Sequence, residues 1–367
     1  MIDYKSQQTS ISLGIGNSTR QNIIQINPND IELQYARITN DKFLYPRQRM
    51  QIESKLDIPN DLINITAIKQ NIKMANRWIQ SAQNPNDFGL PTDDVGSESC
   101  TWASSGLLWS SWVVSGETPN WWIKCLRWVL SQINADNGIP IVLRNDSSIT
   151  DATAYTLMCA SVAGDQFQNT ASILCDWILD MQLNGGWKWS EHAKNYNFIS
   201  SCLALLSIKL YFNITGEKPE RIGKAINHGI EFLVRNRNID GGWGGYPNDI
   251  SRPANTGYVI YVLSILGQGI MANDSLEYLR DKYRDIIGWN NSTDRPASHN
   301  VTRLGVPYSL IGLSSLKPSI ERDELLKLGF DILLCGFKDG VYEIPDSVAR
   351  SWPTRDFMFA CSTMVTD

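Results

Sequence analysis

Helix-length apolar runs follow one another along the chain from about residue 65 onward, and they are of two kinds. The run at 100–114 (CTWASSGLLWSSWVV) carries no charge, and a helix that is apolar nearly all round is a buried helix. The runs at 120–132 and 219–237 carry several charges, which is typical of a helix with one face in solvent. The two kinds alternate, so the pattern predicts buried and half-exposed helices in turn. The other nearly uncharged runs are 152–163, 198–212, 257–267 and 305–316.

A glycine-containing motif, here called the marker, separates each charged run from the uncharged run that follows it. Its fullest copies are 182–189 (QLNGGWKW) and 237–246 (RNIDGGWGGY), and the copies recur about every 50 residues, which indicates a repeat. Glycine accepts a positive φ just past a helix end at little cost. The marker therefore predicts a turn between an exposed and a buried helix, with Trp187 and Trp243 packed into it. Weaker copies contain Gly89, Gly138, Gly288 and Gly340.

Six markers predict six helix pairs, and the charge pattern assigns one helix of each pair to the interior. Two concentric rings satisfy this assignment, so we expect an all-α (α/α)6 toroid over 65–367. An open solenoid is the alternative. Closure is favoured because a solenoid should have atypical capping repeats and an exposed face on both sets of helices. The last repeat also ends at Asp367, where an inner helix would close the ring. Residues 1–64 do not fit the repeat, and we expect an extension on the toroid exterior with a short strand at 22–27.

Composition narrows the class of protein. The formal net charge of −5 argues against a general nucleic-acid surface. The chain has no apolar run of about 18 residues, and its first residues lack the pattern of a signal peptide, so no transmembrane or secretory segment is expected. The seven cysteines lack Cys-x-x-Cys spacing, which is typical of buried thiols in a reducing compartment. We therefore expect a cytoplasmic protein; the sequence predicts no particular oligomeric state.

The marker also carries a family resemblance. The segments 182–187 (QLNGGW) and 241–243 (GGW), each followed by an uncharged helix, resemble the repeat of terpenoid cyclases and protein prenyltransferase β subunits. The resemblance covers about 65–367. It implies a central cavity in which relatives protonate an isoprenoid through an Asp-x-Asp-Asp motif, hold a catalytic zinc, or only bind a ligand.

This resemblance points to Asp151 as a proton donor. In 149–154 (ITDATA), aligning Thr153–Ala154 with the Thr-Ala that follows the cyclase motif places Asp151 on the middle aspartate. The flanking acids of the family are replaced here by Ile149 and Ala152, and Asp146 could substitute for one of them in space. The alternative is a carboxylate that only favours the start of a helix.

A second acidic segment, 91–98 (PTDDVGSE), contains Asp93 and Asp94. These carboxylates could supply the acid or bind a metal, or they could belong to a solvated loop. The three histidines form no pair four residues apart, so a helix-borne zinc motif is absent. The prediction is no metal and no cofactor, with Mg²⁺ possible only as the counterion of a diphosphate substrate.

Arginines gather in the loops of the second half, just before or at the start of the predicted inner helices. Arginine forks and helix N-termini suit a diphosphate or another anion. These side chains could thus form an anion clamp on one rim of the ring. The alternative is that they pair with Asp249, Asp294, Asp346 and Asp356, which are close in sequence. The arginines are Arg252, Arg295, Arg303, Arg350 and Arg355.

Aromatic side chains near the turns could line the cavity. An aromatic face attracts a cation by up to about 2 kcal/mol when the pair is desolvated, which would stabilise a carbocation. The aromatics expected to line the cavity are Trp102, Trp109, Tyr155, Trp189, Tyr246, Tyr258, Tyr308 and Trp352, and all of them except Trp109 and Tyr308 are candidates for substrate binding.

Together these features predict a class II-like, proton-initiated isoprenoid cyclase with Asp151 as its acid, acting on a prenyl diphosphate or a related isoprenoid. A non-catalytic toroid that binds a small anionic or apolar ligand, or a protein partner, is the first alternative, because two of the family's three acids are missing. A glycoside-processing (α/α)6 barrel is the second, and it requires two facing carboxylates.

Overall fold

The computed structural model describes residues 63–92, 98–268, 274–289, 305–342 and 350–364. All of them belong to one compact unit, Phe43–Asp367. The predicted N-terminal extension and its strand at 22–27 lie outside the described residues, except for residues 63 and 64. Asp93, Asp94, Arg295 and Arg303 lie outside them as well.

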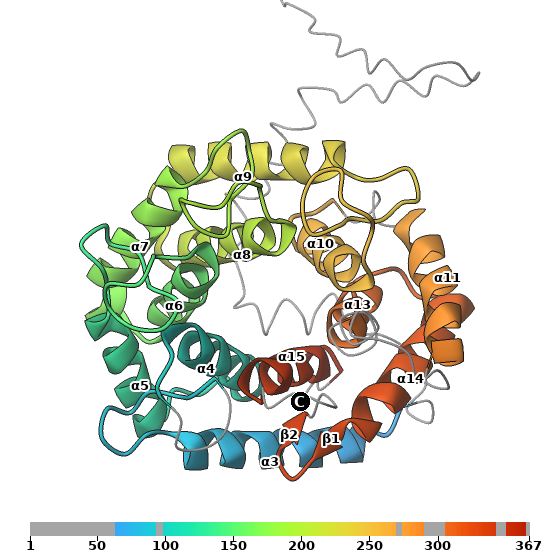
Figure 1. Ribbon diagram of the computed structural model, residues 1–367, viewed down its shortest axis with the longest axis horizontal. Helices are drawn as coiled ribbons and strands as arrows, with labels where there is room; N and C mark the ends of the chain where they lie inside the picture. Colours follow the sequence, from blue (N-terminus) through green and yellow to red (C-terminus); the bar gives the residue numbers. More distant parts are fainter. Residues whose placement is uncertain (1–62, 93–97, 269–273, 290–304, 343–349, 365–367) are drawn as a thin grey trace, which may run out of the picture. The chain divides into compact units, whose positions relative to one another are not determined.

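The described chain forms two concentric rings of helices, as the charge pattern predicts (Figure 1). Exposed and buried helices alternate along the sequence in both halves of the ring. The outer helices are α3 (Ile65–Ala82), α5 (Asn120–Ser131), α7 (Gln168–Asp180), α9 (Pro219–Arg235), α11 (Asp274–Trp289) and α14 (Ile320–Cys335). The inner helices are α4 (Thr101–Ser115), α6 (Thr150–Val162), α8 (Phe198–Thr215), α10 (Pro253–Ile265), α13 (Gly305–Ser314) and α15 (Ser351–Ser362). Short elements are the 3₁₀ turn Asp165–Phe167 and the hairpin of β1 (Phe337–Lys338) and β2 (Val341–Tyr342).

The ring is closed, which excludes the solenoid. Helix α15 packs against both α13 and α4, and α3 contacts α15 and β2 (Figure 1). The Ser351 N–H donates to the Thr92 carbonyl at 3.3 Å, and the Ser351 hydroxyl donates to the Pro91 carbonyl. Gly340, with φ at +90°, places its Cα so that a Cβ would lie 2.9 Å from the Cβ of Trp78 on α3. Segments from the two ends of the described chain thus join the first repeat to the last.

The outer helices bury one face, whereas the inner helices bury most of their residues. Helix α9 buries Ile222, Ala225, Ile226, Gly229, Phe232 and Leu233, the i, i+3, i+4, i+7 spacing of a one-faced helix. Helix α4 instead buries twelve of its fifteen residues. Helix α8 has the length and hydropathy of a membrane-spanning helix, but 72% of it is buried inside the ring, which is typical of a core helix.

Four of the described turns between an outer and an inner helix are fastened by the same pair of hydrogen bonds, here called the clasp, and the turn at Tyr342 has the first bond of the pair. In the third repeat, the Trp187 N–H donates to Ser201 Oγ at 2.9 Å, and the Asn197 N–H donates to the Trp187 carbonyl at 2.9 Å. Trp187 and Trp243 are buried in their turns, as predicted. The first bond recurs in the pairs Leu90–Ser104, Ile139–Thr153, Trp243–Thr256 and Tyr342–Thr354.

An aspartate reinforces three of these clasps. The Asp136 carboxylate accepts the Gly138 N–H at 3.0 Å and the Ser148 hydroxyl at 2.8 Å, and Asp87 and Asp240 do the same in their own repeats. One marker differs from the expectation: Gly288 and Trp289 lie in the last turn of α11 rather than after it. The helix simply continues through this glycine, which is tolerated there at a cost of about 1 kcal/mol relative to alanine.

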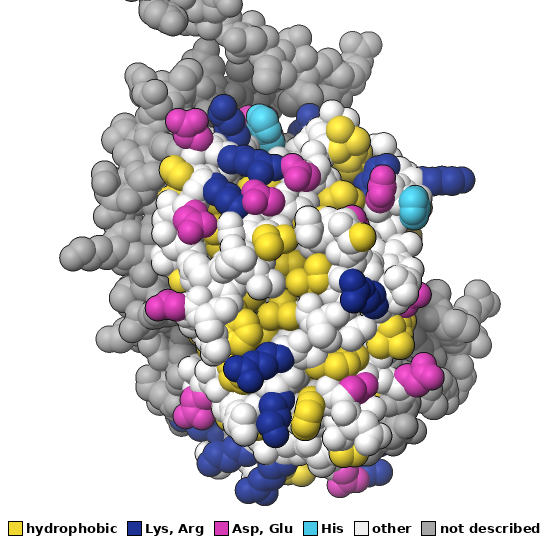
Figure 2. Space-filling model, turned by 90° about the vertical axis from the view of Figure 1, so that its left-hand side faces the viewer, with side chains coloured by type: hydrophobic (Ala, Val, Ile, Leu, Met, Phe, Trp, Pro, Cys, Tyr) yellow, Lys and Arg dark blue, Asp and Glu magenta, His cyan; other side chains and the backbone are white. Residues whose placement is uncertain are grey.

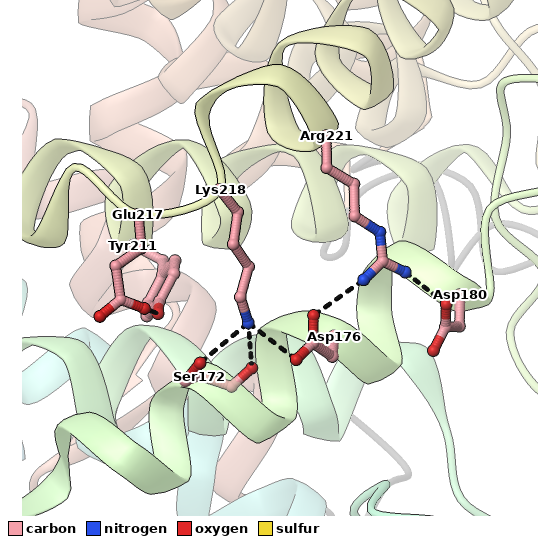
Figure 3. Close-up of polar contacts among 7 residues, drawn as sticks. All are labelled: Ser172, Asp176, Asp180, Tyr211, Glu217, Lys218 and Arg221. Carbon is pink, nitrogen blue, oxygen red and sulfur yellow. Dashed lines mark hydrogen bonds and ion pairs between the residues drawn. The ribbon is translucent and has the colours of Figure 1, made fainter.

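The side of the molecule shown in Figure 2 carries charges of both signs, with hydrophobic side chains visible between them. Neighbouring helices α7 and α9 are joined by ion pairs (Figure 3). Asp176 accepts from Lys218 Nζ and from Arg221 Nη1, each at 2.8 Å, and Arg221 also pairs with Asp180. Lys218 Nζ further donates to Ser172 Oγ at 2.8 Å. Because these groups are largely solvent-exposed, they orient the two helices more than they stabilise the fold.

Candidate active site

Asp151 lies in the first turn of α6, on the inside of the ring, and its side chain is buried. The Ser200 hydroxyl, from the first turn of α8, donates to Asp151 Oδ1 at 2.5 Å. Burial raises the pKa of Asp151 to about 6, against the opposing effects of the Ser200 hydrogen bond and of the Arg355 charge. The structure thus contains a carboxyl group that can hold a proton near neutral pH.

Arg355, from the first turns of α15, contacts two aromatic rings. Its guanidinium carbon is 4.9 Å from the Trp102 ring centroid and 5.3 Å from the Tyr155 ring centroid. The side chain is buried, and its Nε donates to Asp356 Oδ1 at 2.7 Å. Burial disfavours the Arg355 charge, but the adjacent Asp356 carboxylate, together with Tyr155 and Tyr308, outweighs this effect and raises the pKa of the guanidinium. Arg355 and Asp356 therefore form a buried ion pair.

Helices α4 and α15 pack closely together, and a glycine on α4 leaves space for the Arg355 side chain. A Cβ added at Gly106 of α4 would lie 2.6 Å from Arg355 Cδ. Because any side chain at this position would overlap the arginine stem, glycine is what allows the guanidinium to reach Trp102 and Tyr155. The two residues belong to the first and the last inner helix, α4 and α15, and meet only because the ring closes.

Three tyrosines, Tyr155, Tyr258 and Tyr308, lie near the Arg355–Asp356 ion pair. The Tyr308 hydroxyl donates to Asp356 Oδ1 at 2.9 Å, and the Tyr258 and Tyr308 ring centroids are 4.9 Å apart. Burial raises the pKa of Tyr155 to about 12, so its hydroxyl stays neutral. We refer to the whole group as the Asp151–Arg355 cluster, which consists of Trp102, Asp151, Tyr155, Ser200, Tyr258, Tyr308, Arg355 and Asp356.

Two polar atoms of this cluster are buried without a hydrogen-bond partner in the described part of the chain. They are Nε1 of Trp102, a donor, and Oδ2 of Asp356, an acceptor. The Asp356 side chain is nearly inaccessible, at 2% exposure of the residue. Leaving such an atom unsatisfied costs about 1–3 kcal/mol, so each of them calls for an explanation in terms of function.

The structure brings together five of the residues that the sequence singles out: Trp102, Asp151, Tyr155, Tyr258 and Arg355. Trp352 is half-buried in the first turn of α15, with no described contact to the cluster. The members that the sequence interpretation did not select as site residues are Ser200, Asp356 and Tyr308. Asp356 and Tyr308 did appear in it, as an arginine partner and as a lining aromatic.

Other expected site residues lie elsewhere. Asp146 does not supplement Asp151, because it is exposed in a turn where its carboxylate accepts the Leu143 N–H at 3.1 Å. Trp189 and Tyr246 are 38% and 43% exposed. Both belong to the loops that follow a marker, and those loops carry them to the surface rather than into the ring.

Two of the three described arginines of the predicted rim clamp, Arg252 and Arg355, pair with aspartates instead. Arg252 is 46% exposed and pairs with Asp249 at 3.2 Å, and Arg355 is buried against Asp356. For these two arginines the structure follows the alternative interpretation, in which each pairs with an aspartate close in sequence. Among the described residues, no group of three or more His, Cys, Asp or Glu side chains is arranged to hold a metal ion.

No family model matches this sequence, and no curated protein matches it. Solved structures match the fold. A type II terpene cyclase from Scytonema, in complex with geranylgeranyl dihydroxybenzoate, has a TM-score of 0.56 at 11% identity, over 82% of this chain and 97% of that chain. A D-mannose isomerase has a TM-score of 0.59 at 10% identity, over 82% and 97%.

An inactive variant of the α-1,6-mannanase of Salegentibacter sp. HEL1_6, in complex with α-1,6-mannotriose, has a TM-score of 0.54 at 11% identity, over 81% of this chain and 98% of that chain. These proteins share the (α/α)6 toroid and differ in activity. At such low identities the likeness establishes the fold of this chain, and function must be argued from its own site.

Proposed function

We propose that this protein is a proton-initiated isoprenoid cyclase in which Asp151 is the general acid. The observation that carries this proposal is a buried carboxyl group, hydrogen-bonded by Ser200, whose pKa of about 6 lets it be protonated near neutral pH. An acid that protonates an alkene must hold its proton in a dry site and still release it. Burial supports the first requirement, and the Ser200 bond and the Arg355 charge support the second by opposing the rise of the pKa.

The aromatic side chains suit the intermediate of such a reaction. Trp102, Tyr155, Tyr258 and Tyr308 bring four rings to the cluster, and two of them already face a cation, Arg355. A carbocation passing such faces is stabilised by the same attraction. The type II terpene cyclase with the same toroid supports the proposal by analogy of fold.

Incubation of the purified protein with prenyl diphosphates, prenyl alcohols and squalene, followed by mass spectrometry of the extracted products, tests this function. We expect cyclic products from the wild type and a loss of at least about 100-fold in Asp151→Asn, since a positioned acid contributes that order of rate. The matched control is Asp146→Asn, which alters an exposed carboxylate after the same marker and should retain activity. Equal product profiles of wild type and Asp151→Asn would reject the proposal.

A second candidate, a glycoside-processing enzyme, is favoured by one observation: Asp356 is a second buried carboxyl in the same cluster. Glycosidases use two carboxyl groups on either side of the scissile bond. Asp151 accepts from Ser200 and Asp356 accepts from Arg355, so the two carboxyls have different partners, while burial raises the pKa of both. Release of reducing sugar from α-mannosides by the wild type, but not by Asp151→Asn, would support this candidate over the first.

A further inference from the structure

The turn of the third repeat, which contains Gly186, differs from its neighbours at three positions that lie together. In the three reinforced clasps an aspartate stands two residues before the marker glycine, and it accepts from a serine nine or ten residues after that glycine. In the third repeat these two positions hold Asn184 and Tyr196. The Asn184 amide donates to the Tyr196 hydroxyl at 3.0 Å, so a different pair of side chains replaces the aspartate and the serine.

The third position lies on the next outer helix. In the first and second repeats it holds a tryptophan, Trp128 or Trp177, whose ring lies against the marker glycine. Trp177 Nε1 also donates to Asp136 Oδ2 at 3.2 Å. In the third repeat the residue is Phe232 of α9, whose ring would lie 2.7 Å from a Cβ added at Gly186. Because phenylalanine is smaller than tryptophan and has no N–H group, this turn keeps more open space and has one donor fewer.

A pocket opens at this turn. Its volume is about 630 Å³, against about 320 Å³ for the pocket at the corresponding place in the second repeat, and such a volume is typical of a small-molecule site. Asn184, Tyr196 and Phe232 line it together with Glu231 and Arg235, which are one helical turn apart on α9. None of the lining residues belongs to the Asp151–Arg355 cluster, so the pocket is a separate place on the molecule.

The pocket presents hydrogen-bond acceptors and donors together. The amides of Asn184 and Asn236 donate to the Tyr196 hydroxyl and to the Phe232 carbonyl, at 3.0 and 2.7 Å, which leaves their Oδ1 atoms to accept. The exposed Glu231 carboxylate is a further acceptor. Arg235 Nη2 donates to the Asn184 carbonyl at 2.8 Å, and a guanidinium has five N–H donors in all. A ligand that uses this lining must accept and donate at several points, as a set of hydroxyl groups does.

The pocket also contains an aromatic ring and a balance of charge. The half-buried Tyr196 ring packs edge-on against Phe232, with centroids 5.5 Å apart, and it gives the lining an apolar surface. Glu231 would repel an anion and Arg235 would repel a cation, while His228 can donate or accept. An uncharged ring with an apolar face and hydroxyls around its edge fits all of these groups, and this is the chemistry of a sugar.

We propose that this pocket is a second binding site, which takes a sugar residue between α9 and the turn of the third repeat. Tyr196 supplies the apolar surface, and Glu231 and Arg235 supply hydrogen bonds to hydroxyl groups. The inference does not depend on the reaction that the Asp151–Arg355 cluster performs, because no residue is shared between the two sites.

Ligand-observed NMR titration of the full chain tests the inference with the methyl glycosides of glucose, mannose and galactose. At least one of the three should bind the wild type. Glu231→Gln and Arg235→Gln each remove a charged partner of the hydroxyls, so that glycoside should bind on the order of tenfold more weakly to either variant. Glu220→Gln makes the same change at an exposed position of α9 outside the pocket; it is the matched control and should bind as the wild type does.

A further variant closes the pocket. Phe232→Trp restores the tryptophan of the first two repeats and should abolish glycoside binding by filling the space. Circular dichroism establishes that this variant folds; if it does not, Glu231→Gln and Arg235→Gln decide.

Three outcomes would overturn the inference. One is that none of the three glycosides binds the wild type. Another is that alanine or inorganic phosphate, used as zwitterionic and anionic probes, binds in their place and depends on Arg235. The last is that glycoside binding survives in Glu231→Gln and Arg235→Gln but is lost in Asp151→Asn, which would place the sugar inside the ring and support the second candidate function instead.

Discussion

Asp151 shows how burial outweighs local helix electrostatics at the scale of a residue. A carboxylate in the first turn of a helix is stabilised by the helix dipole, typically by 0.3–1 kcal/mol, which lowers its pKa by less than one unit. The pKa of Asp151 is instead raised, to about 6, because desolvation is the largest effect on it. Its place at a helix start therefore does not account for its protonation, and the enclosure of the site does.

The pKa of Asp151 predicts a pH dependence of stability. Since the folded pKa lies above the ordinary value of 3.8, the native state binds this proton more tightly than the unfolded state does. Stability from this group is complete below about pH 4 and is lost as the pH rises to about 6. At 1.36 kcal/mol per pKa unit, the loss is about 3 kcal/mol.

Urea unfolding between pH 4 and 7 measures this dependence, with Asp151→Asn as the comparison. The difference in unfolding free energy between the two proteins should change by that amount across the window, in favour of the wild type at the acidic end. A constant difference from pH 4 to 7 would contradict the pKa. If Asp151 is also the acid, the product formation of the wild type should decline above about pH 6.

At the scale of elements, the clasp explains why the marker recurs. Each outer helix must end, and the chain must turn inward while keeping its backbone polar groups bonded. A serine or threonine in the first turns of the inner helix meets this need. In four repeats it accepts the N–H of the residue after the marker glycine, and in the last repeat it accepts the N–H of Tyr342, two residues after Gly340. The two marker tryptophans, Trp187 and Trp243, are buried in their turns.

Two threonines of α6 provide a matched test of the clasp. Thr153 accepts the Ile139 N–H at 2.9 Å, whereas Thr156 only donates to the Ala152 carbonyl of its own helix. Both are fully buried. Thr153→Val leaves a buried donor unsatisfied and should reduce the unfolding free energy by about 1–3 kcal/mol. Thr156→Val should cost clearly less in the same denaturant titration, and equal losses would show that the clasp bond is not what matters.

The clasp was only partly predictable from sequence. The glycine and the buried tryptophan of each marker are local features, and they indicated the turn. The aspartates Asp87, Asp136 and Asp240 were missed as turn residues, although an Asp-x-Gly spacing in each of these repeats could have revealed them. Gly288 was misassigned because its neighbours permit the helix to continue through it.

At the scale of the whole molecule, closure assembles the cluster. Its members come from α4, α6, α8, α10, α13 and α15, so every inner helix contributes at least one residue. Arg355 reaches Trp102 only because α15 packs against α4. An open array of the same repeats would leave these two residues far apart.

Removing residues 350–367 tests closure. Because α15 packs against α4 and α13, its loss exposes apolar surface on both sides of the gap and deletes Arg355. We expect a protein that binds a hydrophobic dye and unfolds without a sharp transition in circular dichroism. In a solenoid, a lost terminal repeat removes only its own contacts with one neighbour, so a truncated chain with an unchanged, cooperative transition would argue against the ring.

The sequence by itself determined the helices, their assignment to two rings and the position of the turns other than the one assigned to Gly288. These depend on periodicity and on the free energy of burying one face or all faces of a helix, which are properties of short segments. It also indicated Asp151, and it presented the pairing of Arg355 with Asp356 as one of two possibilities. Only the tertiary structure decided between them, because desolvation favours a neighbouring counterion over an exposed clamp.

Only the tertiary structure brought the Ser200 hydroxyl to the Asp151 carboxyl and Gly106 next to the Arg355 side chain. No periodicity relates these residues, which meet through the packing of α6 with α8 and of α15 with α4. It likewise left Trp102 Nε1 and Asp356 Oδ2 without partners in the described chain. Whether a buried polar atom finds a hydrogen-bond partner depends on every element packed around it, and this packing cannot be predicted from a short segment of sequence.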